Sequence, residues 1–499
     1  MASLKKIAIS GLFWTFTERF SVQGIQFVIS VILARLLLPE DFGMIGMILV
    51  FVSIGTTLRD SGMTNSLIRS LNPTETDYST VFFINFASSV LIYLLFFITA
   101  PWIAGFYKME LLTDLVRVQS LTILIGSFSS IQYARLTKSM NFKKQLAIQL
   151  PSMLLGGGLG IGMAFFGYGV WSLVWMNVFQ SSAASVQYWF LTKWRPQFIF
   201  SKAKMKEHFN FGYKLTLSSL LDSIYNNFLY MIIGKFFSAA QLGFYTRANS
   251  TKNLPLNNIS SALFKVTYPL FSKIQEDTLR LKALYRKLMQ QVLFWVIPSL
   301  LSIAVIAEPL FRVLFTEKWV PAASYFQILC AVGALYPLNS YNLSILNVKG
   351  RSDLYLKVQV INKVYTVLLT LAMLPLGIYA MLFMQILISV LNFIVNTYYA
   401  GKLIDYPIGE QLKDVAPIFL IGLIMLGACF GVDYLLLEFL DYDLARVCVV
   451  PLLGFTIYFF LAKLMKLPSM AELEETFGSR KKHLVANSLK KKDSMTLFV

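Results

Sequence analysis

Residues 78–106 read YSTVFFINFASSVLIYLLFFITAPWIAGF, a stretch of 29 residues without one charged side chain. An α-helix needs roughly 20 apolar residues to cross a hydrocarbon layer about 30 Å thick, and this stretch is longer than that. Backbone groups inside lipid must satisfy their own hydrogen bonds, and the stretch is too long and too evenly apolar for a barrel strand. It therefore predicts a membrane-spanning helix.

Similar stretches fill the chain almost from end to end. The 499 residues are 56% hydrophobic with a mean hydropathy of +0.63, which excludes an ordinary soluble protein. We predict fourteen spans, at 9–37, 42–66, 78–106, 113–137, 145–166, 168–192, 208–236, 241–266, 288–315, 321–346, 354–375, 377–401, 414–437 and 444–465. The expected fold class is therefore an all-α polytopic membrane protein, with both termini on the same side.

The net charge of +18 is distributed unevenly between the two sides of the membrane. If the N-terminus is cytoplasmic, the connections on that side hold most of the lysines and arginines. The opposite side offers little beyond Lys108, Arg117 and Lys318. This asymmetry follows the positive-inside rule. It predicts a multi-pass membrane protein with cytoplasmic termini, and we expect no nucleic-acid partner.

A faint internal repeat divides the chain. The segment ILARLLLPEDFG at 32–43 is followed 200 residues later by IIGKFFSAAQLG at 232–243. In both, a cation, an outer turn and a glycine that opens the next helix recur in register. Six spans separate the copies, so both enter the membrane in the same direction, as in a parallel repeat about an axis along the membrane normal. A match this short can also arise by chance.

The repeat predicts two lobes of seven helices around a central cavity. We place an N-terminal lobe with helices one to six and a basic linker at 1–200, a C-terminal lobe with the terminal helices at 201–465, and a basic cytoplasmic tail at 466–499. Rocking of two such repeats is a common route to alternating access. The cleft between the lobes is therefore the expected site.

Ionisable side chains inside apolar helices are the strongest functional signal, because a charge in lipid is costly unless it faces protein or water. The predicted substrate-binding set is Arg19, Arg59, Lys214, Asn226, Arg247, Lys252 and Lys363. The acids that are candidates for ion coupling or for salt bridges are Glu18, Asp60 and Asp222. Cations outnumber acids, which suits a substrate that carries phosphate or carboxylate.

Structural interpretations stay open for these residues. Four charged residues of the first two expected spans can form an internal salt-bridge clamp that touches no substrate, namely Glu18, Arg19, Arg59 and Asp60. Arg35 and Lys235 lie near the outer turns, where their side chains can snorkel to the interface. The amides of Asn339, Asn342 and Asn347 can either face a cavity or join helices to one another.

Signals for catalysis are weak. His208 and His483 are the only histidines, which disfavours histidine-based acid–base chemistry or a histidine metal cluster. Cys330, Cys429 and Cys448 lack metal-ligand spacing, and the sequence has no Walker loop. We predict a protein that is not an enzyme and has no catalytic residues, metal or cofactor.

Three motifs carry a resemblance to a known family. RLLLPEDFG at 35–43, FTEKW at 315–319 and VKGRSD at 348–353 resemble the polysaccharide-transporter (Wzx-type oligosaccharide flippase) branch of the multidrug/oligosaccharidyl-lipid/polysaccharide exporter superfamily, over essentially the whole chain up to about residue 465. The resemblance implies a transporter with a cationic central cavity. It also implies that a polyprenyl-pyrophosphate-linked oligosaccharide repeat unit passes from the inner to the outer leaflet for capsule, O-antigen (lipopolysaccharide) or exopolysaccharide synthesis.

The expected partners follow from that mechanism. They are the lipid-linked oligosaccharide, membrane lipid, a proton or Na⁺, and the polysaccharide polymerase machinery. Two alternatives stay open at this point. One is an antiporter of drugs, small amphiphiles or cations from the same superfamily, and the other is a non-transporting membrane component of a polysaccharide-synthesis complex.

Overall fold

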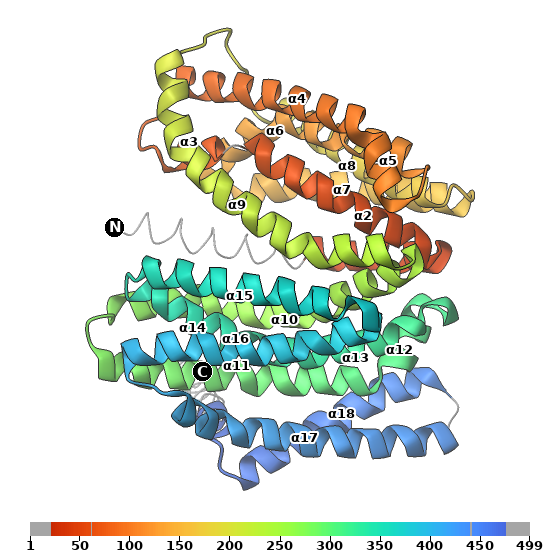
Figure 1. Cartoon of the computed structure of the whole chain (residues 1–499), viewed down its shortest axis with the longest axis vertical. Helices are drawn as coiled ribbons and strands as arrows, with labels where there is room; N and C mark the ends of the chain where they lie inside the picture. Colours follow the sequence, from red (N-terminus) through yellow and green to blue (C-terminus); the bar gives the residue numbers. More distant parts are fainter. Residues whose placement is uncertain (1–20, 61, 440–441, 476–499) are drawn as a thin grey trace, which may run out of the picture. The chain divides into compact units, whose positions relative to one another are not determined.

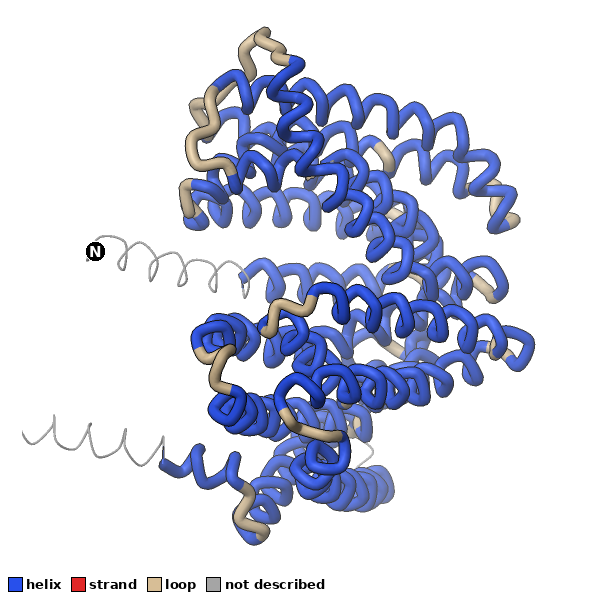
Figure 2. The backbone as a smooth tube through the Cα atoms, turned by 60° about the vertical axis from the view of Figure 1, so that its left-hand side comes forward, coloured by secondary structure: helices blue, strands red, loops and turns tan. Residues whose placement is uncertain are grey.

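The computed structural model describes residues 21–60, 62–439 and 442–475, and within these ranges it is helical and contains no strand (Figures 1 and 2). The first described helix is Ser21–Leu36. It is followed by α2 (Pro39–Asp60), α3 (Met63–Arg69), α4 (Glu75–Tyr107), α5 (Leu112–Gln119), α6 (Leu121–Lys138), α7 (Phe142–Phe165), α8 (Val170–Leu191), α9 (Lys202–Phe236), α10 (Ala239–Lys273), α11 (Thr278–Val305), α12 (Ala307–Phe315), η1 (Glu317–Trp319), α13 (Pro321–Ala334), α14 (Tyr336–Val348), α15 (Ser352–Ala372), η2 (Leu374–Leu376), α16 (Ile378–Ile404), α17 (Ile408–Phe439) and α18 (Asp443–Leu464).

The helices confirm a multi-pass, all-α membrane protein. Eight helical segments in the described ranges are long and apolar enough to cross a membrane, namely α2, α4, α7, α11, the α13–α14 pair, α16, α17 and α18. The expected spans from 42–66 onward all fall on helices. Helices α9 and α10 are 35 residues long and carry more polar side chains. The total of fourteen spans stays a prediction.

Several expected spans are broken helices. The span expected at 42–66 is divided between α2 and α3 by Gly62, whose φ is 65°. A Cβ on Gly62 would lie well within 3.0 Å of the Gly212 backbone on α9, so this break lets α9 approach closely. The span expected at 113–137 is likewise divided at Ser120, between α5 and α6.

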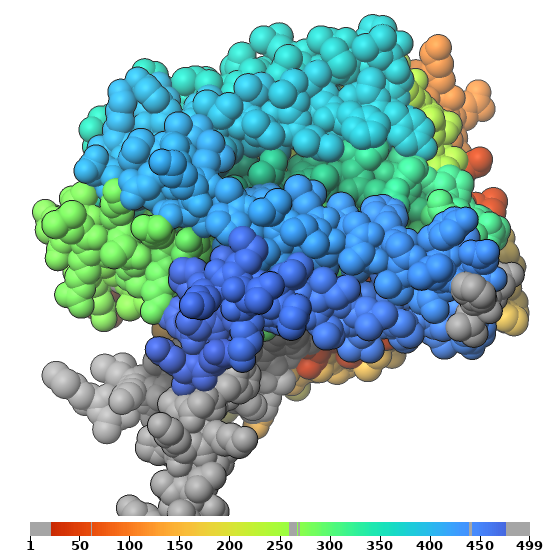
Figure 3. Space-filling view, turned by 90° about the horizontal axis from the view of Figure 1, so that it is seen from below, coloured from red at the N-terminus to blue at the C-terminus, as the bar shows by residue number. Residues whose placement is uncertain are grey.

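The chain forms two compact units, Met1–Thr246 (unit 1) and Arg247–Val499 (unit 2). In unit 1, α9 runs along α2, and α7 pairs with α8 (Figure 1). In unit 2, α11 is surrounded by α13, α14, α17 and α18, and residues of α15 to α18 cover much of the face seen in Figure 3. Unit 1 ends at Thr246, whereas the predicted N-terminal lobe ends at residue 200. Unit 1 extends further because α9 packs on α2. The lobe boundaries stay a prediction.

The turn predicted from the sequence repeat occurs twice in the structure. Before α2, the Leu38 backbone N–H donates to Asp41 Oδ2 at 2.9 Å. Before α10, the Ser238 backbone N–H donates to Gln241 Oε1 at 3.1 Å. Asp41 and Gln241 hold equivalent positions in the two copies, so different side chains cap the same turn.

The two copies of the turn also meet at their glycines. A Cβ on Gly43 would lie well within 3.0 Å of the Ala239 carbonyl oxygen, and a Cβ on Gly243 would do the same at the Pro39 carbonyl oxygen. The first turns of α2 and α10 therefore cross with their main chains in direct contact, within unit 1. The Lys235 ammonium donates a hydrogen bond to the Phe106 carbonyl at the end of α4. This contact gives Lys235 a structural role.

The beginning of the predicted basic tail packs on unit 2. Leu467 and Ser469 are buried, and Gln291 on α11 donates to Glu472 Oε2 at 2.8 Å. Burial alone would raise the pKa of the Glu472 carboxyl, but hydrogen bonds from Lys287 and Gln291 outweigh it and lower this pKa. Residues up to 475 are thus part of the folded unit, whereas the rest of the tail lies outside the described residues.

Candidate substrate cavity

Unit 1 contains an open cavity of about 790 Å³, and many of the residues that line it are polar. Its walls come from the Ser21–Leu36 helix and from α2, α3, α5, α6, α7 and α8. The polar uncharged residues that line it are Gln26, Thr64, Asn65, Gln119, Thr122, Ser129, Ser130, Tyr133, Gln149, Ser152, Asn177, Gln180, Ser181 and Tyr188. Amides and hydroxyls both donate and accept hydrogen bonds, so this wall can solvate water or sugar hydroxyl groups.

Arg59 is the one cation and Asp60 the one acid among the described residues that line this cavity. Arg59 Nε donates to Asp60 Oδ1 at 2.8 Å, and the two side chains are 15% and 47% exposed. Gly126 on α6 makes room for the guanidinium, because a Cβ there would lie 2.5 Å from Arg59 Nη1. The structure therefore places Arg59 at the cavity wall and joins it to Asp60.

Three predicted residues share one surface of α9. Lys214, Asp222 and Asn226 are exposed and are separated by multiples of four residues, which places them on one face of the helix. The opposite face is fixed to α2, where Ser53 Oγ lies 2.8 Å from Ser223 Oγ and accepts from Asn227 at 3.3 Å. A polar stripe on a helix of spanning length is expected to face water or protein rather than lipid.

Arg247 lies on α10 inside unit 2 and is only 7% exposed. Its Cζ atom is 4.9 Å from the Phe315 ring centroid and 5.2 Å from that of Trp319. Both rings are buried, and together they offer π faces to the guanidinium. The FTEKW motif at 315–319 thus has a physical role, because its first and last residues hold this cation.

Lys252 and Lys363 have different surroundings. Lys252 is 9% exposed in unit 2, where its Nζ donates to Asn249 Oδ1 at 2.9 Å and its stem packs at Gly333 on α13. Lys363 is half-buried midway along α15. Substrate contact by these lysines stays a prediction. Glu18 and Arg19 lie outside the described residues.

The amides of α14 join helices. Asn342 donates to Thr397 Oγ1 on α16 at 3.0 Å and accepts from Tyr285 on α11 at 3.0 Å. Asn339 accepts from Asn396 on α16 at 3.1 Å. For these two amides the structure supports interhelical hydrogen bonding, one of the two interpretations that the sequence left open.

The sequence of residues 32–324, more than half of the chain, matches a family described as "Polysaccharide biosynthesis protein". The chain belongs to this family. The chain is 27% identical over 465 residues to the teichuronic acid biosynthesis protein TuaB of Bacillus subtilis, an alignment that covers 92% of this chain and 96% of that protein. It is 25% identical to the lipopolysaccharide biosynthesis protein WzxC of Escherichia coli, over 72% of this chain and 73% of that one.

Solved structures confirm the fold of the chain. The lipid II flippase MurJ in an inward closed conformation superposes with a TM-score of 0.74 at 14% identity, over 92% of this chain and 98% of that chain. An inward-facing multidrug resistance MATE family transporter superposes with a TM-score of 0.59 at 15% identity, over 76% of this chain and 94% of that chain. Both belong to the fold class predicted from the sequence.

One polar cluster of unit 1 was not predicted from the sequence. His208 on α9 lies between Asp77 Oδ1, 3.0 Å from its Nε2, and Ser66 Oγ, 2.8 Å from its Nδ1. Asp77 also forms a capping box with Thr74 at the start of α4. Lys204 Nζ lies 3.2 Å from Asp77, and the hydrogen bonds that it donates to Glu207 and to Asp77 raise the pKa of this ammonium. The cluster ties α3, α4 and α9 together at one end of unit 1.

We expect replacement of Asp77 by asparagine to destabilise unit 1. The change removes an ionised acceptor that Thr74 and His208 share, and a hydrogen bond to a charged group contributes about 1.5–3 kcal/mol. Thermal unfolding of the purified protein in detergent measures the loss. Asp114→Asn is the matched control, because the Asp114 side chain is 66% exposed. Equal unfolding temperatures for the two variants would contradict a structural role for the cluster.

Proposed function

We propose that this protein moves a polyprenyl-pyrophosphate-linked oligosaccharide repeat unit from the inner to the outer leaflet of the bacterial plasma membrane. The product would serve capsule, O-antigen or exopolysaccharide synthesis. The observation that carries the proposal is a cavity lined by many polar residues and one arginine, in a chain whose family is described as "Polysaccharide biosynthesis protein". A relative in Rhizobium meliloti, 25% identical, is named a succinoglycan biosynthesis transport protein, and the MurJ fold neighbour is a lipid II flippase.

In this proposal, different residues contact different parts of the substrate. Amides and hydroxyls of the unit 1 cavity hydrogen-bond the glycan, while Arg59 and the exposed Lys214 attract the pyrophosphate. The polyprenyl tail stays in lipid, and alternating access changes which leaflet is open. The acids Asp60 and Asp222 are candidates for coupling to a proton or Na⁺. In this proposal the protein acts as a transporter rather than an enzyme, with both termini in the cytoplasm, and passes its product to a polymerase.

The leaflet distribution of the lipid-linked repeat unit tests this function. The gene is deleted in its native host, and right-side-out and inverted vesicles are probed with an enzyme that modifies the sugar. Accumulation on the cytoplasmic leaflet, relieved by the wild-type gene, is the expected result. An unchanged distribution would contradict flipping. It would favour drug or small-cation export if drug susceptibility rises, and a non-transporting role in a synthesis complex if it does not.

Arg59→Gln is expected to lower flipping about 10- to 100-fold in the same vesicles. The glutamine removes a charge-assisted hydrogen bond, which contributes about 1.5–3 kcal/mol, and about 1.4 kcal/mol corresponds to a factor of ten. Gly126→Ala should lower flipping as well, because the new methyl group displaces the guanidinium. Arg117→Gln removes the same charge from α5, outside the cavity, and should retain activity. Wild-type flipping by Arg59→Gln would exclude Arg59 from the substrate path.

A further inference from the structure

A second cavity opens at one end of unit 1, where α6 and α7 meet the segment that follows α8. Its volume is about 500 Å³. Four of its ten lining residues are cations, namely Arg135, Lys138, Lys144 and Lys193, and no carboxylate is found among the described residues that line it. Such a concentration of positive charge favours an anionic ligand.

Two of these cations are already fixed by the protein. Arg135 Nη1 donates to Glu75 Oε1 at 2.9 Å, and its guanidinium lies 5.7 Å from the ring centroid of Trp194. The Trp194 indole N–H donates to the same carboxylate at 2.6 Å. Lys138 donates to the Ser70 carbonyl beyond α3. These contacts give the cavity a rigid, positively charged wall.

Three further polar groups at the cavity can serve an occupant, those of Gln132, Lys144 and Lys193. Gln132 is fully buried at the cavity wall, yet neither its Nε2 nor its Oε1 has a hydrogen-bond partner among the described residues. A buried amide without partners is costly, so a ligand that offered both a donor and an acceptor would be stabilised at Gln132. Lys144 and Lys193 form no ion pair in the described part of the chain. The cavity thus offers one amide and two ammonium groups to an occupant.

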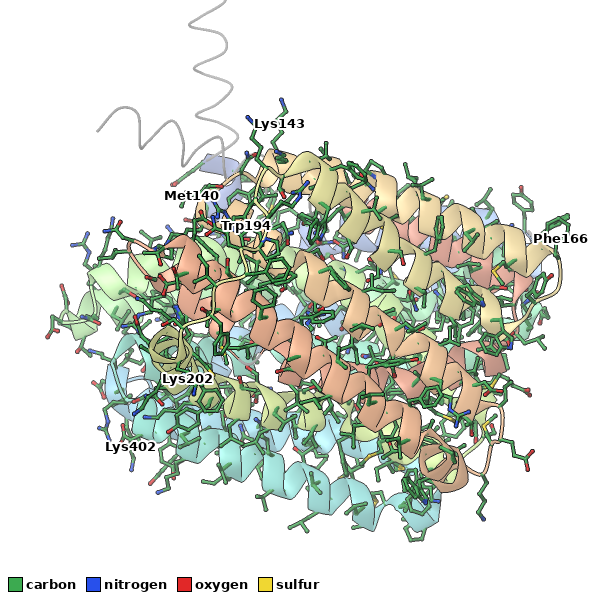
Figure 4. All side chains as sticks on the ribbon, turned by 90° about the horizontal axis from the view of Figure 1, so that it is seen from above. Met140, Lys143, Phe166, Trp194, Lys202 and Lys402 are labelled. Carbon is green, nitrogen blue, oxygen red and sulfur yellow. The ribbon has the colours of Figure 1, made fainter. Side chains whose placement is uncertain are left out.

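The surroundings place this cavity at the level of lipid headgroups. Figure 4 shows Met140, Lys143 and Trp194 at the same end of the helices, and Phe166 at the other end. Met140 exposes its side chain beside the cavity, and Phe190, near the end of α8, is 82% exposed. Lysines beside exposed apolar and tryptophan side chains are typical of a membrane–water interface.

We propose that this cavity binds the headgroup of an anionic glycerophospholipid. Lys144 and Lys193 contact the phosphate, and the Gln132 amide hydrogen-bonds headgroup oxygens. A volume of about 500 Å³ exceeds a bare phosphate and leaves room for the glycerol. The acyl chains then lie against the exposed apolar side chains of the helices. Basic pockets between membrane helices are a recognised way to hold anionic lipids.

Lipid binding to the full-length purified protein tests the proposal. The protein in neutral detergent is titrated with phosphatidylglycerol or with phosphatidylcholine, and bound lipid is counted by native mass spectrometry. We expect phosphatidylglycerol to be preferred and Lys144→Gln/Lys193→Gln to weaken its binding about thirtyfold, since each interfacial lysine contributes on the order of 1 kcal/mol and about 1.4 kcal/mol is a factor of ten. Gln132→Leu should weaken binding without lowering the unfolding temperature.

The control pair is Lys143→Gln/Lys202→Gln, which removes two exposed lysines that do not line the cavity. It should change affinity by less than about twofold, since these charges attract lipid only through the general field. Equal weakening by both pairs, or no preference for phosphatidylglycerol, would overturn the proposal. Displacement of phosphatidylglycerol by an equimolar polyprenyl pyrophosphate would also overturn it, because the site would then belong to the pyrophosphate lipid. None of these outcomes depends on flipping activity.

Discussion

Replacing Gly43 or Gly243 with alanine is expected to prevent the protein from accumulating in a folded form. Each new methyl group would collide with a carbonyl oxygen of the opposite repeat, at Ala239 or Pro39. A main-chain oxygen cannot rotate away as a flexible side chain does, so the two helices must separate. Overpacked sites usually cost about 1–3 kcal/mol, and we place these variants at or above the upper end. The yield of monodisperse protein and its unfolding temperature measure the effect.

Gly158→Ala provides the matched control for both glycine variants. Gly158 lies within α7, and a Cβ there meets nothing within 4 Å. Alanine in a helix interior gains roughly 0.5–1 kcal/mol over glycine, so this control should be neutral or slightly stabilised. Normal yield and stability of both Gly43→Ala and Gly243→Ala would show that the close crossing of α2 and α10 is not required.

Trp319→Ala is expected to produce the second large loss, in unit 2. The indole is fully buried, and truncation of a buried tryptophan costs about 3–5 kcal/mol. The change also removes one of the two rings that face Arg247, and a desolvated cation–π contact contributes about 2 kcal/mol. Unfolding of the purified protein in detergent measures the loss. Trp102→Ala, at a tryptophan that is 70% exposed, should have little effect.

A double-mutant cycle separates the cation–π contact from simple packing. Arg247→Met removes the charge but retains a long apolar side chain. If the ring and the guanidinium interact, Trp319→Ala should cost less in the Arg247→Met background, by about 0.5–3 kcal/mol. Trp319→Phe should restore much of the stability because it retains a π face. Strictly additive losses would show that Trp319 acts through its volume alone.

Apolar runs were sufficient to locate most helices, because every helix that crosses lipid needs a long run of apolar residues whatever the order of its side chains. They could not show where those helices break. No glycine or proline adjoins Ser120 to mark the first break, and the break at Gly62 depends on the approach of Gly212 from a helix far along the sequence. Tertiary contact, rather than local composition, decides such positions.

The sequence identifies the charged residues, but it does not decide which partner each of them has. Intramembrane position alone selects Arg59 and Arg247 equally, whereas the structure sets one beside Asp60 in a polar cavity and the other against two aromatic rings. The polar residues that line the unit 1 cavity were not predicted from the sequence. Their amides and hydroxyls are spread over six helices, and each is too common alone to indicate a site.

The crossing of Gly43 and Gly243 has a consequence for how the repeats diverge. The contact consists of main-chain atoms, so its shape does not depend on the identity of neighbouring side chains. Between 32–43 and 232–243, only Ile32 with Ile232 and Gly43 with Gly243 are identical pairs. A duplicated segment can therefore lose nearly all recognisable similarity while its junction survives, provided that both glycines are retained.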